Sequence, residues 1–365
     1  MRLEDIALTF VPQLGVRGVV HLLECFGSAE AVFAASAEEL HERAGLRDDV
    51  ARNVVAHKGF AEAERELEYC YRHNITPLAS TDEKYPKLLR EIDDYPHILY
   101  VRGSVEALSH RAVAFVGTRK MSPYGDRVCN EMIKSLAEAV PDVTIVSGLA
   151  YGIDGAAHRA AVAAGVTTVG VIANPLPNVT PTTNERLAAD IVGRGGAIVT
   201  ELSSQTKQNG RYFIPRNRII AGLSAGVVVV ESPAEGGSLS TASFADGYGR
   251  SVMAVPGRVT DENSRGCNIL IRNRKAQAVL SGRDIVSELM WELDLEDMPA
   301  EKRAPQPLTS DEERLLACFD DTPMHIDSLL ERSGMSSGEL SLHLMTLEMS
   351  GAIRSLRGGM YEKLK

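Results

Sequence analysis

The sequence predicts an α/β protein with a doubly wound, mostly parallel sheet, a small all-α domain before it and a winged helix after it. Two observations predict the sheet. Between residues 110 and 257, apolar strand-like runs alternate with segments of helical periodicity, and these runs contain few polar positions, so we expect both faces of the sheet to be buried. A third observation, the change of pattern at each end of this region, predicts the two flanking domains.

Residues 1–78 predict a helical domain of the helix-hairpin-helix or SAM-like type. Two short turns, at 12–18 and 43–49, are each followed by an amphipathic run. Hairpins of this kind can offer backbone N–H groups to a phosphate, and they also serve as small packing modules. The pattern leaves both interpretations open.

Residues 79–283 predict the sheet domain. We expect strands at 112–117, 143–148, 168–173, 197–201, 226–231 and 251–257. Between the first two strands, Val128, Met132, Ile133, Leu136, Ala137 and Val140 fall at helical spacing. A helix that joins two successive strands is typical of a parallel sheet, because parallel neighbours need a crossover connection.

The acidic stretch 284–307 shows no sustained period and predicts a linker. After it, residues 308–365 predict a winged helix, with a turn at Gly334, a recognition helix at 337–350 and then a β-hairpin.

The expected recognition helix is poorly suited to DNA. It contains Glu339 and Glu348 but no lysine or arginine, and the hairpin adds only Arg354 and Arg357. Because phosphate binding needs positive charge that displaces counterions, we expect this domain to contact a protein partner or the rest of the chain.

Charge is unevenly distributed along the chain. The formal net charge is −10, but residues 108–282 hold 18 Lys and Arg against 13 Asp and Glu, a net of +5. Residues 1–107 and 283–365 carry −7 and −8. The sheet domain is therefore the part of the chain expected to attract phosphates.

Other function classes are disfavoured by composition. The five cysteines are widely spaced, without a CxxC pair, which argues against a disulfide framework and against a zinc site. The apolar runs are far shorter than the roughly 18 residues of a membrane span. The first ten residues include acids where a signal peptide is basic and then apolar, so we expect a cytoplasmic protein.

The candidate binding residues follow the expected strands. Ligands bind beyond the carboxyl ends of the strands in an open parallel sheet. Those positions are rich in glycine, hydroxyl and basic residues, namely Gly117, Arg119, Lys120, Ser122 and Tyr124 after the first strand, Gly148 and Gly152 after the second, and Gly236, Gly237 and Ser238 after the fifth. Helix amino-termini opened by such residues are ready anion sites, and Ser122 is expected to cap its helix.

The stretch "FIPRNRIIAGLSAG" at 213–226 predicts a helix from about Pro215 to Gly226 whose first turn holds Arg216 and Arg218. Two cations at a helix amino-terminus have the wrong sign for the helix dipole, which indicates an anionic ligand. Phe213 offers a ring for base stacking, and Arg211 adds charge. The alternative is that an arginine pairs internally with Glu201 or Glu231 and that Phe213 belongs to the core.

Two enzymatic patterns are weak or missing. Asp154 and His158 are four residues apart and could form an acid/base pair, but Asp154 is more simply a helix N-cap. The chain has neither GxxxxGK[ST] nor GxGxxG, so ATP hydrolysis and dinucleotide binding lack their motifs.

With these residues assembled, the chain resembles the DNA-processing protein A family, also called DprA or Smf. The resemblance is carried by "YPKLLREIDDYPHILYVRG", "VAFVGTRKMSPYG", "IVSGLAYGIDGAAHRAA", "FIPRNRIIAGLS", "GGSLSTA" and "AVPG", in that order over about 82–257. It implies a Rossmann-like domain that is not an enzyme, takes no cofactor or metal, binds single-stranded DNA, forms a homodimer and helps to load the RecA recombinase in natural transformation.

The resemblance also assigns site residues. It puts the pocket arginine at Arg119, the aromatic and basic stretch at Phe213, Arg216, Asn217 and Arg218, and the glycine turns at Gly148, Gly152, Gly236 and Gly237. The sequence departs from the family at two places. "TPTTN" lacks the family's aromatic residue, although its Asn184 can correspond to the family's asparagine. "LIRNRKA" replaces a family glycine but adds Arg272, Arg274 and Lys275. The added cations are expected to extend the phosphate track.

Two other functions remain open. "GGSLSTA" is also similar to the phosphate loop of phosphoribohydrolases, nucleotide-processing enzymes in which a carboxylate, here Glu231 or Asp154, assists bond cleavage. An adaptor that acts through the winged helix and the helical domain is the third possibility, and it is compatible with DNA binding.

Overall fold

The structure is a computed structural model that describes residues 2–291, 309–320, 322–349, 352–356 and 359–364. The chain divides into two compact units, residues 1–293 and residues 294–365. The first unit contains the helical amino-terminal segment and the sheet, and the second contains the winged helix.

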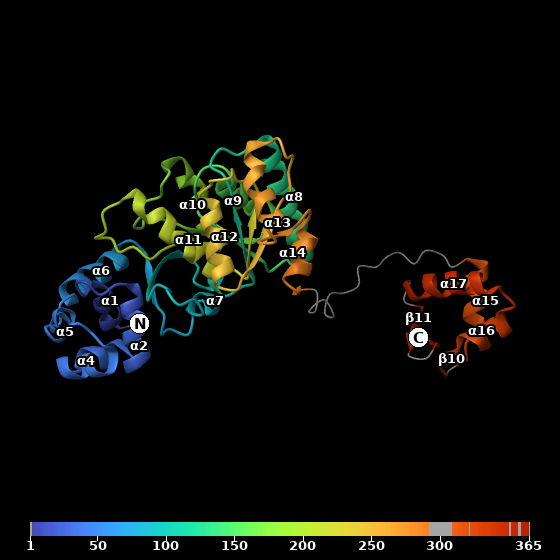
Figure 1. The fold of residues 1–365 in the computed structure, drawn as a ribbon, viewed down its shortest axis with the longest axis horizontal. Coiled ribbons are helices and arrows are strands. Elements are labelled where there is room, and N and C mark those ends of the chain that lie inside the picture. Colours follow the sequence, from blue (N-terminus) through green and yellow to red (C-terminus); the bar gives the residue numbers. More distant parts are fainter. Residues whose placement is uncertain (1, 292–308, 321, 350–351, 357–358, 365) are drawn as a thin grey trace. The chain divides into compact units, whose positions relative to one another are not determined.

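Six helices form the amino-terminal segment, shown in blue in Figure 1. They are α1 (Leu3–Phe10), α2 (Val16–Phe26), α3 (Ala29–Ala34), α4 (Ala37–Ala44), α5 (Asp48–Val55) and α6 (Phe60–Arg72). Turns join α1 to α2 and α4 to α5, where the sequence predicts its two hairpins. Ser28 and Ser36 cap α3 and α4 through their hydroxyl groups, which explains why these helices begin there.

A nine-stranded sheet forms the centre of the first unit, in the order β1-β2-β6-β5-β4-β3-β7-β8-β9. The strands are β1 (Thr76–Ala79), β2 (Ile98–Gly103), β3 (Ala112–Val116), β4 (Thr144–Ser147), β5 (Thr167–Val171), β6 (Ala197–Thr200), β7 (Gly226–Val229), β8 (Ser251–Ala254) and β9 (Gln277–Ala278). In this sheet order, the seven strands β6-β5-β4-β3-β7-β8-β9 are parallel. β1 and β2 are added at one edge and pair antiparallel. The predicted doubly wound, mostly parallel sheet is confirmed.

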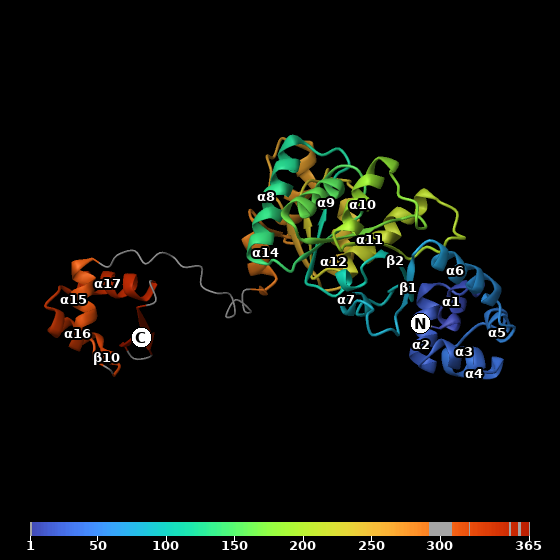
Figure 2. The ribbon, with the colours of Figure 1, turned by 180° about the vertical axis from the view of Figure 1, so that it is seen from behind.

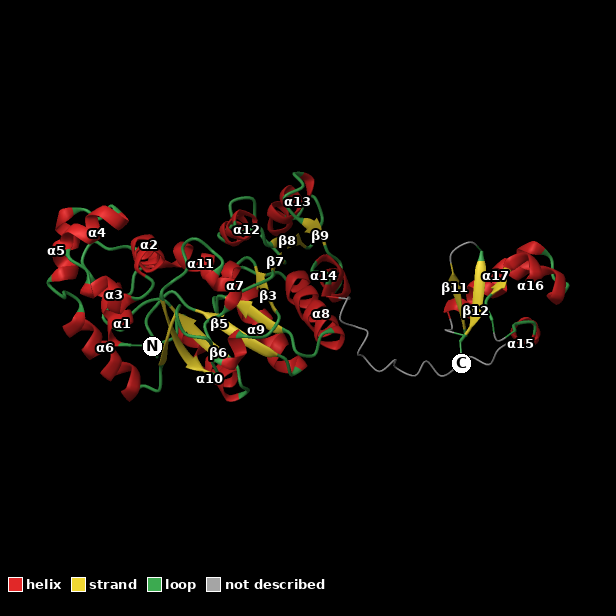
Figure 3. Cartoon of the chain, turned by 90° about the horizontal axis from the view of Figure 1, so that it is seen from below, coloured by secondary structure: helices red, strands yellow, loops and turns green. Residues whose placement is uncertain are grey.

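Helices cover both faces of the sheet, as Figure 3 shows. α8 (Pro123–Ala139), α9 (Ile153–Ala164) and α14 (Gly282–Glu288) pack on one face, and α7 (Lys87–Arg90), α11 (Phe213–Gly222), α12 (Ser238–Gly247) and α13 (Arg265–Arg272) on the other. α10 (Glu185–Gly193) packs against α9, β5 and β6. In the view from behind, α8 and α14 again lie side by side (Figure 2). Burial on both faces explains why the strands β3 to β7 are mostly apolar, with a few threonines and one serine among them.

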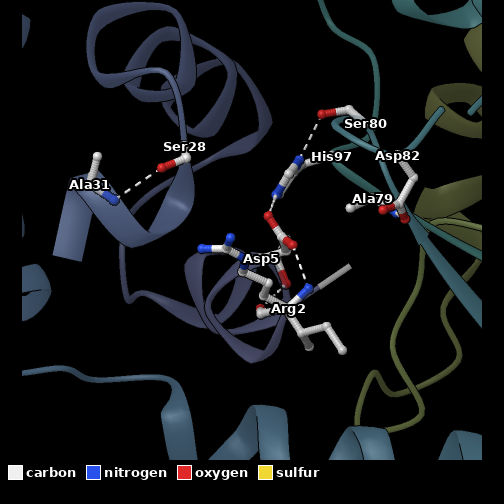
Figure 4. A network of polar contacts seen from close by, with 10 residues as sticks. Arg2, Asp5, Ser28, Ala31, Ala79, Ser80, Asp82 and His97 are labelled. Carbon is white, nitrogen blue, oxygen red and sulfur yellow. Dashed lines mark hydrogen bonds and ion pairs between the residues drawn. The ribbon is translucent and has the colours of Figure 1, made fainter.

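The amino-terminal helices are attached to the sheet by a buried polar network (Figure 4). His97, just before β2, lies between Asp5 of α1 and Ser80, with its Nε2 3.4 Å from Asp5 Oδ1 and its Nδ1 2.7 Å from Ser80 Oγ. Asp5 also accepts a hydrogen bond from the backbone N–H of Arg2 at 2.7 Å. These contacts give the buried Asp5 carboxylate polar partners at the start of α1 and next to β2, so the network connects the helical segment to the sheet.

The described residues of the second unit form three helices and a three-stranded sheet of order β10-β12-β11. Its elements are α15 (Ser310–Ala317), β10 (Met324–His325), α16 (Ile326–Ser333), α17 (Ser337–Met349), β11 (Ile353–Leu356) and β12 (Met360–Lys363). Gly334 ends α16 with a φ of 66°, as the predicted turn requires. Leu340, Leu344 and Leu347 of α17 are buried in its core, which explains the helical spacing of these leucines.

Several predicted boundaries need correction. The predicted linker begins at 284, but α14 continues to Glu288, and residues 292–307 of that linker lie outside the described residues. The predicted recognition helix includes residue 350, and the hairpin includes Arg357; both lie outside the described residues. The predicted helix from Pro215 to Gly226 in fact runs from Phe213 to Gly222, because residues 226 to 229 form β7.

Within the described part of the chain, no helix has both the length and the apolar character that a membrane span requires. The same residues contain no group of three or more His, Cys, Asp or Glu side chains that could hold a metal ion.

Candidate nucleic-acid interface

A cavity of about 460 Å³ lies beyond the carboxyl ends of β3 and β7, bordered by α11 and α12. It brings together nine of the predicted site residues: Gly117, Arg119, Lys120, Phe213, Arg216, Asn217, Gly236, Gly237 and Ser238. These residues come from three separate loops of the sequence. They meet because parallel strands end at the same edge of the sheet.

Arg119 and Phe213 form the mouth of this cavity. The Arg119 guanidinium carbon lies 5.0 Å from the centre of the Phe213 ring, a cation–π contact. Arg119 and Lys120 are exposed, and Phe213 is half-buried. The loop that carries Arg119 is packed tightly against Gly152, where a side chain would collide with Thr118 O and with the Arg119 backbone. Gly152 also has a φ of 75°, so glycine is required there on two grounds.

Arg216 forms the inner wall of the cavity and is 5% exposed. Its Nη1 donates to Gly148 O at 2.6 Å and to Val171 O, at the ends of β4 and β5. Burial lowers the pKa of Arg216 to about 10, and the nearby Asp154 carboxylate opposes this shift, so the guanidinium stays charged at neutral pH. Arg216 therefore places a fixed positive charge inside the cavity while its own hydrogen bonds hold it in place.

Gly148 allows Arg216 and Asp154 to approach each other. A Cβ atom at Gly148 would lie 2.5 Å from Asp154 Oδ2 and 2.8 Å from Arg216 Nη1. Burial raises the pKa of Asp154, and the positive charge of Arg216 opposes that shift. Asp154 is in the first turn of α9, and the N-cap is Gly152, so the predicted N-cap at Asp154 is wrong.

The amino-terminus of α12 forms another wall. Gly237 is its N-cap and makes no side-chain hydrogen bond, while Ser238 Oγ donates to Ser232 Oγ at 2.9 Å. Asn217 Nδ2 joins this wall to α11 by donating to Ser240 Oγ at 3.0 Å. The N–H groups of Leu239 and Ser240 donate to Gly236 O and Gly237 O, so it is mainly the positive end of the helix dipole that favours an anion here.

Three predicted residues, Ser122, Asn184 and Tyr124, do not line this cavity. Ser122 caps α8, as predicted, and its hydroxyl and backbone N–H donate to Glu231 at 2.5 and 2.9 Å. Asn184 is buried and donates to Leu149 O at 3.0 Å. Tyr124 lies in a different cavity, where its hydroxyl donates to Pro256 O at 2.9 Å.

Arg218 is bound internally. It is 6% exposed, and it pairs with Glu201 at 2.5 Å and with Asp94 at 3.7 Å. The alternative interpretation, internal pairing with Glu201, is therefore confirmed for Arg218. Together with Arg211, Arg218 lines a second cavity on the other side of α11, so neither residue faces the first one.

Arg274 and Lys275 are exposed, and neither residue lines either cavity. They precede β9, which is parallel to β8, so they are at the amino-terminal edge of the sheet. The expected extension of the phosphate track through these residues does not fit this placement.

Several lining residues have no counterpart in the predicted set. They are Val116, Thr118, Ala150, Asp154, Ile214, Ile220, Pro233 and Thr241. Ile214 is 60% exposed beside Phe213, and Thr241 is one helical turn after Ser238. The i, i+3 spacing of Ser238 and Thr241 is the signal that could have found Thr241.

His158 takes no part in the cavity. It is fully buried on α9, with its Nδ1 2.7 Å from Thr168 Oγ1, and burial lowers its pKa to about 3. An imidazole that stays neutral and enclosed cannot exchange protons with a ligand in the cavity, so the acid/base pairing with Asp154 has no support in this geometry.

Comparison with known proteins identifies the family. The family model described as DNA recombination-mediator protein A matches residues 76–290, and the DprA winged helix domain matches residues 299–359. Protein Smf of Escherichia coli K12 is 37% identical over 297 residues, which cover 80% of this chain and 78% of that protein. DNA processing protein DprA of Bacillus subtilis 168 is 40% identical over 217 residues, which cover 59% of this chain and 71% of that protein.

Solved structures agree with this result. The crystal structure of DNA processing protein A from Streptococcus pneumoniae superposes with a TM-score of 0.69 at 31% identity, covering 79% of this chain and 98% of that one. A structure of DNA processing protein A from Helicobacter pylori, reported for its single-stranded DNA binding mode, gives a TM-score of 0.53 at 25% identity and covers 60% of this chain and 97% of that one. With the sheet, the winged helix and the ordered sequence motifs all matched, this chain belongs to the DNA recombination-mediator protein A family, also called DprA or Smf.

Proposed function

We propose that this chain binds single-stranded DNA with little sequence preference, in the cavity between α11 and α12, and that it acts in DNA processing as a binding protein. The observation that carries the proposal is the cation–π pair of Arg119 and Phe213, placed at the mouth of a cavity with a buried arginine and a helix amino-terminus. A ring beside fixed positive charge is the combination that single-stranded nucleic acid requires. The Helicobacter pylori relative, reported for binding single-stranded DNA, supports the choice of ligand.

The shape of the site favours a single strand over a duplex. Phe213 can stack on a base only if that base is unpaired and turned outward, whereas a duplex keeps its bases inside. The phosphates next to that base would meet Arg119 and Lys120, which are exposed at the mouth. None of these contacts reads a base edge, so affinity depends on the backbone and on stacking more than on sequence.

Fluorescence anisotropy with labelled oligonucleotides tests this proposal. We expect binding of single strands that weakens steeply with salt, because each phosphate contact displaces a counterion. Arg119→Ala should weaken binding to all sequences alike and reduce the salt dependence by about one unit of slope. Lys275→Ala, which removes an exposed cation at the opposite edge of the sheet, is the control and should bind like wild type. Equal affinity for duplex and single strand would contradict the proposal.

The family resemblance supports two finer parts of the proposal: the chain forms a homodimer and helps to load the RecA recombinase in natural transformation. Sedimentation of the purified chain tests the first. For the second, strand-exchange assays with DNA already covered by a single-strand binding protein should show faster RecA assembly when the wild-type chain is added, and no acceleration with Arg119→Ala.

A phosphoribohydrolase activity is the competing function, and one observation favours it: Asp154, a carboxylate, lines the cavity next to the glycine-rich loop. Against it, Asp154 is buried beside Arg216, and the other candidate, Glu231, is held by Ser122. Incubation with nucleoside monophosphates followed by chromatography separates the two functions. Release of free base would support the enzyme.

A further inference from the structure

A second cavity, of about 1170 Å³, lies between the amino-terminal helices and the sheet. α11 separates it from the first cavity, because residues on opposite sides of that helix line the two. The first cavity is lined by Phe213, Arg216 and Asn217. The second is lined by Tyr212, Pro215 and Arg218, which follow one another at intervals of three residues and therefore share a side. An α-helix is about 10 Å across, so a flexible strand can pass around its first turn from one cavity to the other within a few nucleotides.

The wall opposite α11 is the turn between α1 and α2. Residues 13–17 line the cavity there, and the N-cap of α2, Gly15, makes no side-chain hydrogen bond. The first turn of this 11-residue helix therefore directs backbone N–H groups and the positive end of its dipole toward the cavity. Arg17, exposed on the same turn, adds a full positive charge.

Arg218 supplies an independent sign of a ligand. Its side chain is 7% exposed and lines the cavity, yet its Nη1 has no hydrogen-bond partner among the described residues. An enclosed guanidinium N–H without an acceptor is energetically unfavourable, because it has lost its hydrogen bonds to water. A ligand that brings an oxygen or ring nitrogen acceptor to this position would satisfy it.

The charges of the lining define what kind of acceptor fits. The lining holds three arginines, Arg17, Arg211 and Arg218, and two carboxylates, Asp94 and Glu201. Both carboxylates pair with Arg218, so a phosphate would be repelled there, whereas a neutral nucleobase carbonyl would be accepted. Arg17 and Arg211 have no carboxylate left to pair with in the lining, so their positive charges are available to a phosphate.

An aromatic ring is also present. Arg211 lies over the ring of Tyr212, with its guanidinium carbon 5.0 Å from the ring centre, and donates to the Tyr212 hydroxyl at 2.9 Å. This repeats, on the other side of α11, the arginine-on-aromatic arrangement of Arg119 and Phe213. Such a pair can hold a base and its phosphate together.

We propose that the second cavity is a nucleotide subsite for the same DNA strand, with the phosphate at the amino-terminus of α2 between Arg17 and Arg211 and the base directed toward Arg218. The inference rests on the proposed function of the first cavity. It makes the helical segment part of the DNA path, and it gives the α1–α2 hairpin the phosphate-binding role that the sequence left open.

The test compares two strand lengths. A thymidine dinucleotide is too short to span both cavities, whereas an oligothymidylate of about 15 nucleotides falls within the range of known single-strand sites and can reach both. Arg17→Ala should weaken binding of the longer strand about 5-fold and lower its salt slope by about one, with no effect on the shorter strand. Arg65→Ala, an exposed arginine on α6, is the control. Arg119→Ala should weaken both lengths.

The outcomes separate the two proposals. Suppose that Arg17→Ala binds both strand lengths with the affinity of the Arg65→Ala control, while Arg119→Ala binds both more weakly. The proposed second subsite is then wrong, and the proposed first site stands. If Arg17→Ala lowered the affinity for both strand lengths equally, the second subsite would also be overturned, because a short strand bound in the first cavity does not reach the second. If Arg119→Ala has no effect, the proposed function itself fails.

Photocrosslinking gives a readout that does not depend on affinity. A single 4-thiothymidine is moved along the longer strand bound to the wild-type chain. We expect one set of positions to crosslink to peptides containing Phe213, and positions a few nucleotides away to crosslink to peptides containing residues 13–17. Absence of the second set would overturn the subsite.

Discussion

His97 Nε2 lies 3.4 Å from Asp5 Oδ1, and both side chains are buried between α1 and the sheet. A buried pair that loses one partner leaves the other uncompensated, so Asp5→Ala should lower the free energy of unfolding by about 3 kcal/mol. Glu62→Ala, which breaks an exposed pair with Arg65, should cost under about 1 kcal/mol. Urea denaturation followed by circular dichroism measures both. If Asp5→Ala lowered the free energy of unfolding only slightly, the helical segment would be held to the sheet mainly by its apolar contacts.

Asp5 also makes part of the stability depend on acid pH. Burial raises the pKa of Asp5, but the hydrogen bonds from His97 and from the Arg2 backbone outweigh it, and the net pKa is lowered. A carboxyl group with a depressed pKa in the folded state contributes stability above its unfolded pKa, about 4, and loses it as the pH falls through the folded value. As the pH is lowered below 4, the free energy of unfolding should therefore fall more for wild type than for Asp5→Asn.

His158 should produce a separate loss of stability at mildly acidic pH. Burial lowers its pKa to about 3 in the fold, against about 6.5 in the unfolded chain. As the pH falls below 6.5, the unfolded chain binds a proton that the folded chain does not, so stability falls between pH 6.5 and 3. The loss from His158 should reach about 2 kcal/mol between pH 7 and 5.

The His158→Gln variant isolates that effect. Glutamine keeps a polar group near Thr168 but cannot titrate, so its stability should change less than that of wild type between pH 7 and 5. The measurement is the difference between the two urea midpoints across that pH range. Parallel curves would mean that His158 is protonated in the folded state or that its surroundings open.

Phe213 should contribute to DNA binding through stacking. Its ring is half-buried beneath Arg119, so Phe213→Leu keeps an apolar side chain but removes the aromatic face. Loss of one stacked base corresponds to about 1–3 kcal/mol, or roughly 5- to 150-fold in affinity. The salt slope should stay unchanged, because no phosphate contact is removed. If the salt slope changed while the affinity at low salt stayed the same, Phe213 would only position Arg119.

The sequence predicted the central strands well, because strands buried on both faces are mostly apolar. β1, β2 and β9 were not predicted. β9 has only two residues, both exposed, and carries no periodic signal. β1 and β2 pair antiparallel at the edge, outside the alternation of strands and helices that identifies a parallel sheet.

The candidate site could be predicted as a set of loops but not as a surface. The carboxyl ends of parallel strands meet by topology, so Gly117, Arg119 and Gly237 could be grouped from the sequence alone. Which side of α11 each arginine faces could not, since the partners of Arg218 come from β6 and from the loop before β2. The direction of β9 likewise decides where Lys275 lies, and that strand has no sequence signal.

Gly148 should be indispensable, for a steric reason that is independent of backbone strain. A methyl group there would lie 2.5 Å from Asp154 Oδ2 and 2.8 Å from Arg216 Nη1, both of them buried, so Gly148→Ala must push the two charges apart. Overpacking of this kind costs about 1–3 kcal/mol, and DNA affinity should fall together with stability because Arg216 forms the inner wall of the cavity. Gly193→Ala is the matched control, since Gly193 is at the end of α10 with no atom within 4 Å of an added Cβ. Thermal denaturation and anisotropy on both variants should show a large loss for Gly148→Ala and a neutral or slightly stabilised Gly193→Ala. If Gly148→Ala keeps wild-type affinity, Arg216 does not need its present position to bind the strand.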